Sequence, residues 1–349
     1  MFYLVTIIGK YDRKDFVKMK LWKRLLSVTL SVSMLIVSGG CSHMKLINMG
    51  IENQKNKSDR YVAVICKSQD EYWDAVEKGA NEAGEELGIK ITYNAPENET
   101  QIDEQIRLVQ EAINNNANGI VVAPLDSDKL NDVLAQATDK NIQVITIDSD
   151  VSYDGRKTFV GTDNVTAGAI AARQAVNLIG DDGKVAVMAH VEGAQTTIER
   201  KGGFVDEMKE SYPDIEILDN GYCDGQPDIA KDKTKQLLEN NSDVDLIYAT
   251  NEGTAVGVCQ AVEEMGLSGK VRIIGFDSST TEISYLQKGT IDGLIVQNPF
   301  NMGYLGVRNV NKVIDGETIE ERIDTGVTYV TMDNLNDEDT QLLLNPMGN

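Results

Sequence analysis

Histidine and cysteine are scarce in this chain, with two and four residues among 349. The cysteines after Cys41 are odd in number and show no C-x-x-C spacing, so we expect neither a disulfide framework nor a zinc site. His43 precedes the first predicted strand, so a Ser-His-Asp or Cys-His catalytic site would have to use His190. A histidine at a strand end can face a cleft, but more often it makes structural hydrogen bonds. Because the nucleophile motif G-x-S-x-G is also missing, we predict that the protein is not an enzyme and has no cofactor or metal.

Basic residues are also few: 33 Lys and Arg stand against 55 Asp and Glu, and the formal net charge is −22. A chain this acidic disfavours nucleic acid and anionic membrane surfaces as partners. It suits an uncharged or a cationic ligand. The hydrophobic fraction of 41% and the charged fraction of 25% are those of a globular protein, and the length allows two domains of ordinary size.

The apolar run near the N-terminus, at residues 25–37, is too short for a comfortable membrane span. It follows a basic stretch that begins at Met19 and is followed by Ser38-Gly39-Gly40-Cys41. We therefore interpret residues 1–41 as a signal peptide whose true start is Met19. The small-small-Cys ending resembles a bacterial lipobox, which implies lipid modification of Cys41. Ser38 stands where a lipobox usually has Leu or Val, so the alternative is an ordinary secretory signal that is cleaved nearby.

The rest of the chain begins with a polar segment, residues 42–60, which we interpret as a flexible tether. From Tyr61 onward, apolar β-branched runs alternate with helical stretches, and strand starts recur about every 30 residues in both halves, one strand–helix unit each. Right-handed crossovers then predict an α/β fold with two doubly wound parallel-sheet lobes. Strands are expected at residues 61–66, 89–93, 119–123, 144–148, 184–189, 215–218, 246–249, 272–276 and 294–297. Helices are expected at residues 72–87, 102–114, 129–140, 165–179, 198–211, 229–240, 254–265, 282–287 and 301–315.

The last part of the chain sets the arrangement of the lobes. If helix 301–315 packs back on the first lobe, the chain crosses between lobes near Asp163, near Gln297 and near Gly326. Three crossings at one edge form a hinge rather than a loose linker, which is the geometry of a clamshell. Just after the first crossing, Asn164 is the expected N-cap of the next helix. We expect an N-terminal lobe of residues 61–163 and 298–326, and a C-terminal lobe of residues 164–297 and 327–349.

Polar and aromatic side chains gather where predicted strands end, which is where ligands bind in open α/β sheets. Asp70, Tyr72 and Trp73 follow the first strand. Aromatic faces can stack on the C–H face of a sugar ring, while carboxylate, amide and guanidinium groups pair with its hydroxyls. One of the two aromatics is expected in the helix core instead. Asp148 ends its strand and is expected to face the cleft, with a helix or turn cap as the alternative.

The second half of the chain offers a matching set. Asp277 repeats the position of Asp148 at a strand end of the second lobe. Arg200 lies in the first turn of its predicted helix, where a cation opposes the helix dipole, so a functional partner is favoured over solvent. Asn251 either caps the next helix or contacts a ligand. Gln297 ends a strand at the hinge, where it either contacts a ligand or makes a hinge hydrogen bond.

Taken in order, these motifs resemble the ribose-binding-protein group of periplasmic binding proteins, the solute receptors of bacterial sugar ABC importers. The resemblance covers roughly Tyr61 to Asn334, and it lies in the ordered series rather than in a single motif. It implies the periplasmic binding protein-like I fold. The matching segments are Tyr72-Trp73, residues 144–148, Gly161-Thr162-Asp163-Asn164, Glu199-Arg200 with Gly203-Phe204, Asn251-Glu252, residues 274–277, Val296-Gln297 and residues 301–304.

The resemblance also implies which residues contact the ligand. Lys67 is a lesser candidate, because it resembles a lysine at the same strand end in autoinducer-2 receptors. Three departures argue against ribose itself while leaving another small sugar or polyol: Ser149 replaces an arginine, Gly225 replaces an aromatic that closes over the sugar, and Asp70 replaces an asparagine. The ligand-contacting positions are Asp70, Tyr72, Trp73, Asp148, Arg200, Asn251, Asp277 and Gln297.

The function that this likeness implies is capture of a monosaccharide, namely a pentose, hexose or related polyol, and its delivery to an ABC permease. The protein would be an extracytoplasmic lipoprotein, a monomer held at the periplasmic face or cell surface by its lipid anchor. The alternative is a receptor that presents its closed form to a membrane sensor kinase or chemoreceptor. LacI-type repressors share the fold, but a signal peptide in place of a helix-turn-helix and the excess of acid oppose DNA binding.

Overall fold

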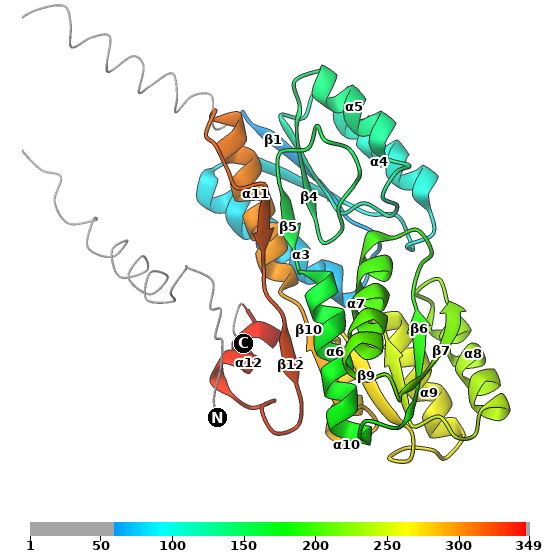
Figure 1. Cartoon of the computed structure of the whole chain (residues 1–349). Coiled ribbons are helices and arrows are strands. Elements are labelled where there is room, and N and C mark those ends of the chain that lie inside the picture. The colour runs from blue at the N-terminus through cyan, green and yellow to red at the C-terminus, as the bar shows by residue number, and fades with distance from the viewer. Residues whose placement is uncertain (1–58, 347–349) are drawn as a thin grey trace, which may run out of the picture. The chain divides into compact units, whose positions relative to one another are not determined.

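The computed structural model describes residues 59–346, which form two α/β lobes (Figure 1). The predicted signal peptide with Met19 and Cys41, and nearly all of the predicted tether, lie outside the described residues. Within residues 59–346 no helix combines the length and the apolar character that crossing a membrane requires.

The first lobe is built on a six-stranded sheet in the order β11-β5-β4-β3-β1-β2, and all of its pairings are parallel. Its inner strands β1, β3 and β4 are mostly apolar, as expected for strands that helices cover on both faces. Side chains of α3 and α11 pack on one face, and those of α4 and α5 on the other. The elements are β1 (Tyr61–Ile65), α3 (Glu71–Leu87), β2 (Lys90–Asn94), α4 (Ile102–Asn114), β3 (Gly119–Val122), α5 (Asn131–Asp139), β4 (Gln143–Ile147), β5 (Phe159–Gly161), α11 (Pro299–Ile314) and β11 (Arg322–Asp324).

The second lobe repeats this plan with the order β12-β10-β9-β8-β6-β7, in which only the β10–β12 pairing is antiparallel. Helices α6 and α7 cover one face, and α8, α9, α10 and α12 cover the other. The elements are α6 (Asn164–Ile179), β6 (Lys184–Ala189), α7 (Gln195–Ser211), β7 (Glu216–Tyr222), α8 (Pro227–Asn240), β8 (Leu246–Ala249), α9 (Glu252–Glu264), β9 (Arg272–Phe276), α10 (Thr280–Lys288), β10 (Gly293–Val296), β12 (Thr328–Val330) and α12 (Glu338–Leu344).

These two sheets confirm the predicted α/β fold of two doubly wound lobes. The chain passes from one sheet to the other three times, and each passage is short. As a result the two carboxyl edges of the sheets are held next to each other. The passages run from β5 to α6, from β10 to α11 and from β11 to β12.

Three local predictions are wrong, and the first is the end of β7, which lies at Tyr222 and not at residue 218. The N-cap of α6 is Asp163, whose side chain accepts a hydrogen bond from the backbone N–H of Thr166 at 3.1 Å. Asn164 is instead the first, buried residue of that helix, and its side chain is used elsewhere. Helix α7 begins at Gln195, earlier than predicted, so Arg200 lies in the second turn and not in the first. No side chain caps α7, which leaves no sequence signal for its start.

Candidate ligand-binding site

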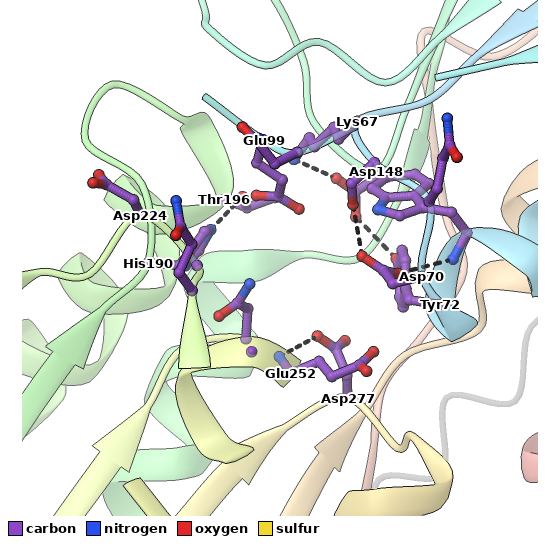
Figure 2. A pocket seen from close by; sticks show the side chains of 18 of the residues that line it. Lys67, Asp70, Tyr72, Glu99, Asp148, His190, Thr196, Asp224, Glu252 and Asp277 are labelled. Atoms are coloured by element: carbon purple, nitrogen blue, oxygen red, sulfur yellow. Dashed lines mark hydrogen bonds and ion pairs between the residues drawn. The ribbon is translucent and has the colours of Figure 1, made fainter. Parts of the chain in front are cut away.

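A cavity of about 290 Å³ lies between the two lobes, at the carboxyl ends of the strands of both sheets (Figure 2). Parallel strands end at a common edge, so the residues that follow them come together even when they are far apart in the sequence. All nine candidates from the sequence line this cavity: Lys67, Asp70, Tyr72, Trp73, Asp148, Arg200, Asn251, Asp277 and Gln297.

A second cavity, of about 1020 Å³, adjoins the first. The two share part of their lining, namely Tyr72, Glu252, Asp277 and Gln297. The second cavity is bounded by the first turns of α3 and α10, by the start of α11, and by the segment that carries α12.

Asp148 and Lys67 form a buried ion pair on the side of the first lobe. Lys67 Nζ lies 2.7 Å from Asp148 Oδ2 and donates a hydrogen bond to Ser149 Oγ at 2.5 Å. Tyr72 donates its hydroxyl to Asp148 Oδ1 at 2.9 Å. Burial alone would raise the pKa of Asp148, but the charges of Lys67 and Arg200 and these hydrogen bonds hold it below its ordinary value. The carboxylate is therefore ionised, and its partners are side chains, so it is not a helix cap.

Ser149 is one of the departures from the ribose-receptor pattern, since an arginine was expected there. In this chain the serine oxygen accepts a hydrogen bond from Lys67, and Lys67 is the cation beside Asp148. A cation is thus present next to this carboxylate, although it comes from the end of β1 rather than from the residue after Asp148.

The two aromatic residues at the start of α3, Tyr72 and Trp73, have different roles. Trp73 is 2% exposed and belongs to the hydrophobic core of the first lobe, yet it also forms part of the cavity wall. Tyr72 meets the Trp73 ring edge to face, with 4.9 Å between centroids. Asp70 is the N-cap of α3, because its carboxylate accepts from the Trp73 backbone N–H, and burial raises the pKa of Asp70.

Arg200 reaches the cavity from α7 and is almost completely buried. Its Nε donates to Asn164 Oδ1 at 2.8 Å, and its Nη1 donates to the Thr250 carbonyl at 2.9 Å. The guanidinium lies over the ring of Phe276, 3.7 Å from the centroid. The backbones of α6 and α7 approach closely here, because a Cβ on Gly168 would lie 2.2 Å from the Arg200 carbonyl oxygen.

On the side of the second lobe, Asp277 connects two neighbouring residues. Gln297 Nε2 donates to Asp277 Oδ1 at 2.7 Å, and the Glu252 backbone N–H donates to Asp277 Oδ2 at 3.1 Å. Burial raises the pKa of Asp277, although Arg200 opposes the rise. Like Asp148, Asp277 has a positive φ, at 87° against 61°, a backbone conformation that is uncommon outside glycine and tends to occur at functional sites.

Asn251 has one of the two roles that the sequence left open for it, the helix cap. Its Oδ1 caps α9 by accepting from the backbone N–H of Thr254 at 3.0 Å and from the Thr254 hydroxyl at 2.5 Å. The residue also lines the cavity, and its amide nitrogen is the part of the side chain that can donate to a ligand.

His190 also lines the cavity, but both of its ring nitrogens are engaged by threonines. Nδ1 lies 2.7 Å from Thr250 Oγ1, and Nε2 lies 3.0 Å from Thr196 Oγ1. Burial, together with the charges of Arg200 and Lys67, lowers the pKa of His190 well below its ordinary value. The imidazole is neutral and serves as a hydrogen-bonding wall. Within residues 59–346 the remaining cysteines are free buried thiols, and no group of His, Cys, Asp and Glu side chains is arranged to hold a metal ion.

Sequence reasoning missed several acidic residues of the cavity wall. Glu99 follows β2, Asp224 follows β7, and Glu252 is the first residue of α9, after β8. Burial raises the pKa of Glu99 to about 7. Burial, followed by the nearby carboxylates, raises the pKa of Glu252 to about 8. Figure 2 shows Glu252 and Asp277 on one side of the cavity, opposite Lys67 and Asp148.

A family model described as "Periplasmic binding protein domain" matches residues 62–318. Among curated proteins, the chain is 27% identical over 271 residues to the D-allose-binding periplasmic protein of Escherichia coli K12, covering 75% of this chain and 87% of that protein. It is 24% identical over 289 residues to the ribose import binding protein RbsB of Haemophilus influenzae, covering 82% and 96%.

Solved structures of solute binding proteins are similar to this chain at higher sequence identity. An ABC transporter solute binding protein from Agrobacterium vitis with bound D-fucose is 35% identical, with a TM-score of 0.78 over 80% of this chain and 98% of that chain. A carbohydrate transporter solute binding protein from Agrobacterium radiobacter in complex with D-arabinose is 33% identical, with a TM-score of 0.79 over 82% and 99%.

Proposed function

The chain belongs to the periplasmic binding protein domain family, and from this premise we propose that it captures a monosaccharide between its lobes and delivers it to an ABC importer. The family is one of binding proteins, which confirms the prediction that the chain is not an enzyme. The ligand class is inferred from relatives named for D-allose and ribose and from solved relatives that hold D-fucose and D-arabinose. The proposal rests on the cavity, whose wall is formed by residues at the strand ends of both lobes.

The size and lining of this cavity fit one sugar ring. A volume of about 290 Å³ is close to the lower limit of the roughly 300–1,000 Å³ that small-molecule sites occupy. Sugar hydroxyls need both donors and acceptors. Arg200, Lys67 and the Asn251 amide offer donors, while Asp70, Asp148 and Asp277 offer acceptors. Tyr72 and Trp73 add aromatic surface against the C–H faces of a ring.

Contacts between the lobes support a closed form that encloses this ligand. On one side of the cleft the Thr280 backbone N–H and hydroxyl both donate to Glu71 Oε2, at 2.7 and 2.8 Å. On the other side the Asp150 backbone N–H donates to the side-chain oxygen of Gln195. A ligand that contacts both lobes favours this closed form over an open one, because only closure satisfies both of its faces.

The finer parts of the proposal concern where the protein works. We infer that residues 1–41 direct export, that Cys41 carries a lipid, and that a monomer is held outside the cytoplasmic membrane by this anchor. The ABC permease would dock on the lobe surfaces beside the cleft, since closure changes their relative position. The lobe boundaries proposed are residues 61–163 with 298–326, and 164–297 with 327–349.

A thermal-shift screen over pentoses, hexoses and polyols tests the proposal. A ligand at 100 times its Kd adds about 2.7 kcal/mol to the free energy of unfolding, so a true ligand raises the melting temperature clearly. Arg200→Ala should abolish most of that shift, whereas Arg173→Ala, an exposed arginine on α6 of the same lobe, should keep it. If no sugar or polyol raises the melting temperature of the wild type, the proposed function is wrong.

A further inference from the structure

The second-lobe side of the cavity holds hydrogen-bond acceptors that have no donor. Gln297 Oε1 and Glu252 Oε2 are both buried, and neither has a hydrogen-bond partner within the described part of the chain. Both residues line the cavity, and Gln297 is only 2% exposed. Buried polar atoms are almost always paired, so two unpaired acceptors in one cavity wall indicate donors that a ligand supplies.

Asp277 brings a third acceptor group to the same place. Its two oxygens hold Gln297 and Glu252 through the side-chain and backbone hydrogen bonds at 2.7 and 3.1 Å. Neither Asp277 nor Glu252 forms an ion pair with any residue of the described range 59–346. Two carboxyl groups and one amide oxygen thus converge without a cation in contact.

The two cations of the cavity are committed to other partners. Lys67 is paired with Asp148 and Ser149 across the cavity. Arg200 is held by Asn164 and the Thr250 carbonyl, although its charge still partly offsets that of Asp277. Within residues 59–346 neither cation forms an ion pair with Glu252.

The other groups that face Glu252 are acids. Asp70 and Glu71 approach from the start of α3, Asp277 from the end of β9, and Glu282 from α10. After burial, the charges of Asp70, Asp277 and Glu71 raise the pKa of Glu252, and Ser279 opposes the rise only in part. At neutral pH Glu252 therefore keeps its proton, and ionising it in this buried corner is costly unless a cation enters.

We propose that the ligand is an amino sugar, and that its protonated amino group binds among Glu252 Oε2, Gln297 Oε1 and Asp277. An ammonium group carries three N–H donors and one positive charge, so it matches three acceptors of which two are carboxyl groups. A hydroxyl group offers one donor and no charge, so a single hydroxyl in place of the amine leaves acceptors at this corner unpaired. This inference rests on the proposed function, because it places the amine on a sugar held by the rest of the cavity.

A neutral sugar at the same corner would require a different protonation state of Glu252. Glu252 would then have to stay protonated and act as a donor itself. Binding of an ammonium group instead favours the ionised form of Glu252, so the proton leaves when the ligand binds. The two ligand classes therefore differ in the number of protons released as well as in affinity.

The first experiment compares matched sugars by calorimetry at pH 6.5: 2-amino-2-deoxyhexoses, the parent hexoses and the N-acetylated forms. We expect the amine to bind at least about 10-fold more tightly than its parent, as hydrogen bonds to charged groups are the stronger ones. Glu252→Gln should reduce this preference about 5- to 10-fold, because it keeps the shape but removes the charge. Glu239→Gln, an exposed glutamate on α8 of the same lobe, should leave the preference unchanged.

A second variant, Asp277→Asn, removes the other charge. Asparagine tolerates the positive φ of 87° at this position, so the backbone is kept. We expect it to reduce the preference for the amine as Glu252→Gln does. Glu252→Gln should also melt at a higher temperature than the wild type without ligand at pH 8. A carboxyl whose folded pKa is raised destabilises the fold as pH rises toward that pKa, and glutamine removes this effect.

The second experiment measures proton release by titrating the amino sugar in buffers of different ionisation enthalpy at pH 6.5. The wild type should release about one proton per ligand, and Glu252→Gln none. A parent hexose that binds as tightly as its amine, or amine binding without proton release, overturns the inference while leaving the proposed function intact. If neither amino sugars nor neutral sugars bind, both the inference and the proposed function fail.

Discussion

Arg200 in the cavity wall is joined to Asn164 at the hinge: its Nε donates to Asn164 Oδ1 at 2.8 Å. Asn164 is the first residue of α6, directly after the first passage between the lobes, and its own amide nitrogen donates to the Thr162 carbonyl within that passage. Arg200 is thus connected through one side chain to the first passage between the lobes. Gln297 at the second passage is joined to Asp277 in the same way.

The first prediction follows from this link. Asn164→Ala leaves the buried Arg200 Nε without its acceptor, which costs about 1–3 kcal/mol of unfolding free energy and lets the guanidinium shift. We expect sugar affinity to fall roughly 5- to 10-fold even though Asn164 does not line the cavity. Calorimetry on Asn164→Ala measures this effect, and Asn177→Ala, exposed on the same helix, is its control. Equal affinities for the two variants would show that Asn164 does not position Arg200.

The second prediction concerns Asp148 and Arg200, which come from opposite lobes. A hydrogen bond to a charged group contributes about 1.5–3 kcal/mol, so alanine at either position should weaken binding roughly 10- to 150-fold. Calorimetry with a confirmed ligand measures the loss. Unchanged affinity in both variants would remove these two residues from the binding site.

The third prediction tests the buried Lys67–Asp148 pair. Lys67→Met leaves the Asp148 carboxylate buried without its cation, which should cost about 3–5 kcal/mol at pH 7. Lys129→Met removes an exposed lysine whose partner Asp126 still accepts two backbone N–H hydrogen bonds, so it should cost less than about 1 kcal/mol. Urea unfolding measures both values. The double variant Lys67→Met/Asp148→Asn should recover most of the loss, and failure to recover would mean that the lysine acts through packing instead.

The same pair sets the sign of a pH effect. The pKa of Asp148 is lowered in the folded protein, so the stability it contributes is present above the ordinary pKa of an aspartate. That stability is lost as the pH falls through the lowered folded pKa. Without Lys67 the burial of Asp148 is unopposed by its nearest cation, so Lys67→Met should begin to lose this contribution at a higher pH than the wild type. A stability profile with the same acid limb in both proteins would contradict this.

The fourth prediction concerns anchoring. A lipid on Cys41 should place the protein in the membrane fraction, and Cys41→Ala should release it. Mass spectrometry of the wild type checks for the lipid directly. If Cys41→Ala stays with the membrane to the same extent and the wild type carries no lipid, the signal is an ordinary one that is cleaved nearby.

Much of the fold was predictable because its physical cause is local. Buried parallel strands such as Gln143–Ile147 need β-branched apolar residues on both faces, and that pattern is visible in sequence. The polar residue after such a strand then falls at the cavity, as Asp148 and Asp277 do. Edge strands are only half-buried and carry mixed residues, so the end of β7 was placed too early. Asp224 was missed for this reason.

Other parts of the site depend on contacts that no local pattern encodes. Asp163 and Asn164 are both good N-cap residues, and only the position of Arg200 on another helix decides that the asparagine is used for hydrogen bonding instead. Glu252 looks like a first-turn acid of α9, a common surface position. Its place in the cavity follows from the packing of α9 against Asp277 and the facing lobe.

The fifth prediction is that ligand binding closes the lobes and that the Glu71–Thr280 contact holds them closed. The wild type should show a smaller radius of gyration by small-angle scattering when saturated with ligand, since the lobe faces approach. Glu71→Ala removes an acceptor of two hydrogen bonds between the lobes. Affinity should therefore fall about 3- to 10-fold, mainly through faster dissociation.

Glu85→Ala, in the last turn of the same helix and exposed, serves as the control and should bind as the wild type does. Glu71→Ala should still reach the compact scattering profile at saturating ligand. The reason is that ligand contacts with both lobes drive closure, whereas Glu71 only stabilises the closed form further. A profile that does not change when a confirmed ligand saturates the wild type would mean that occupancy is not signalled by closure. The permease would then have no altered surface to recognise, and the transport mechanism proposed for this protein would have to be abandoned.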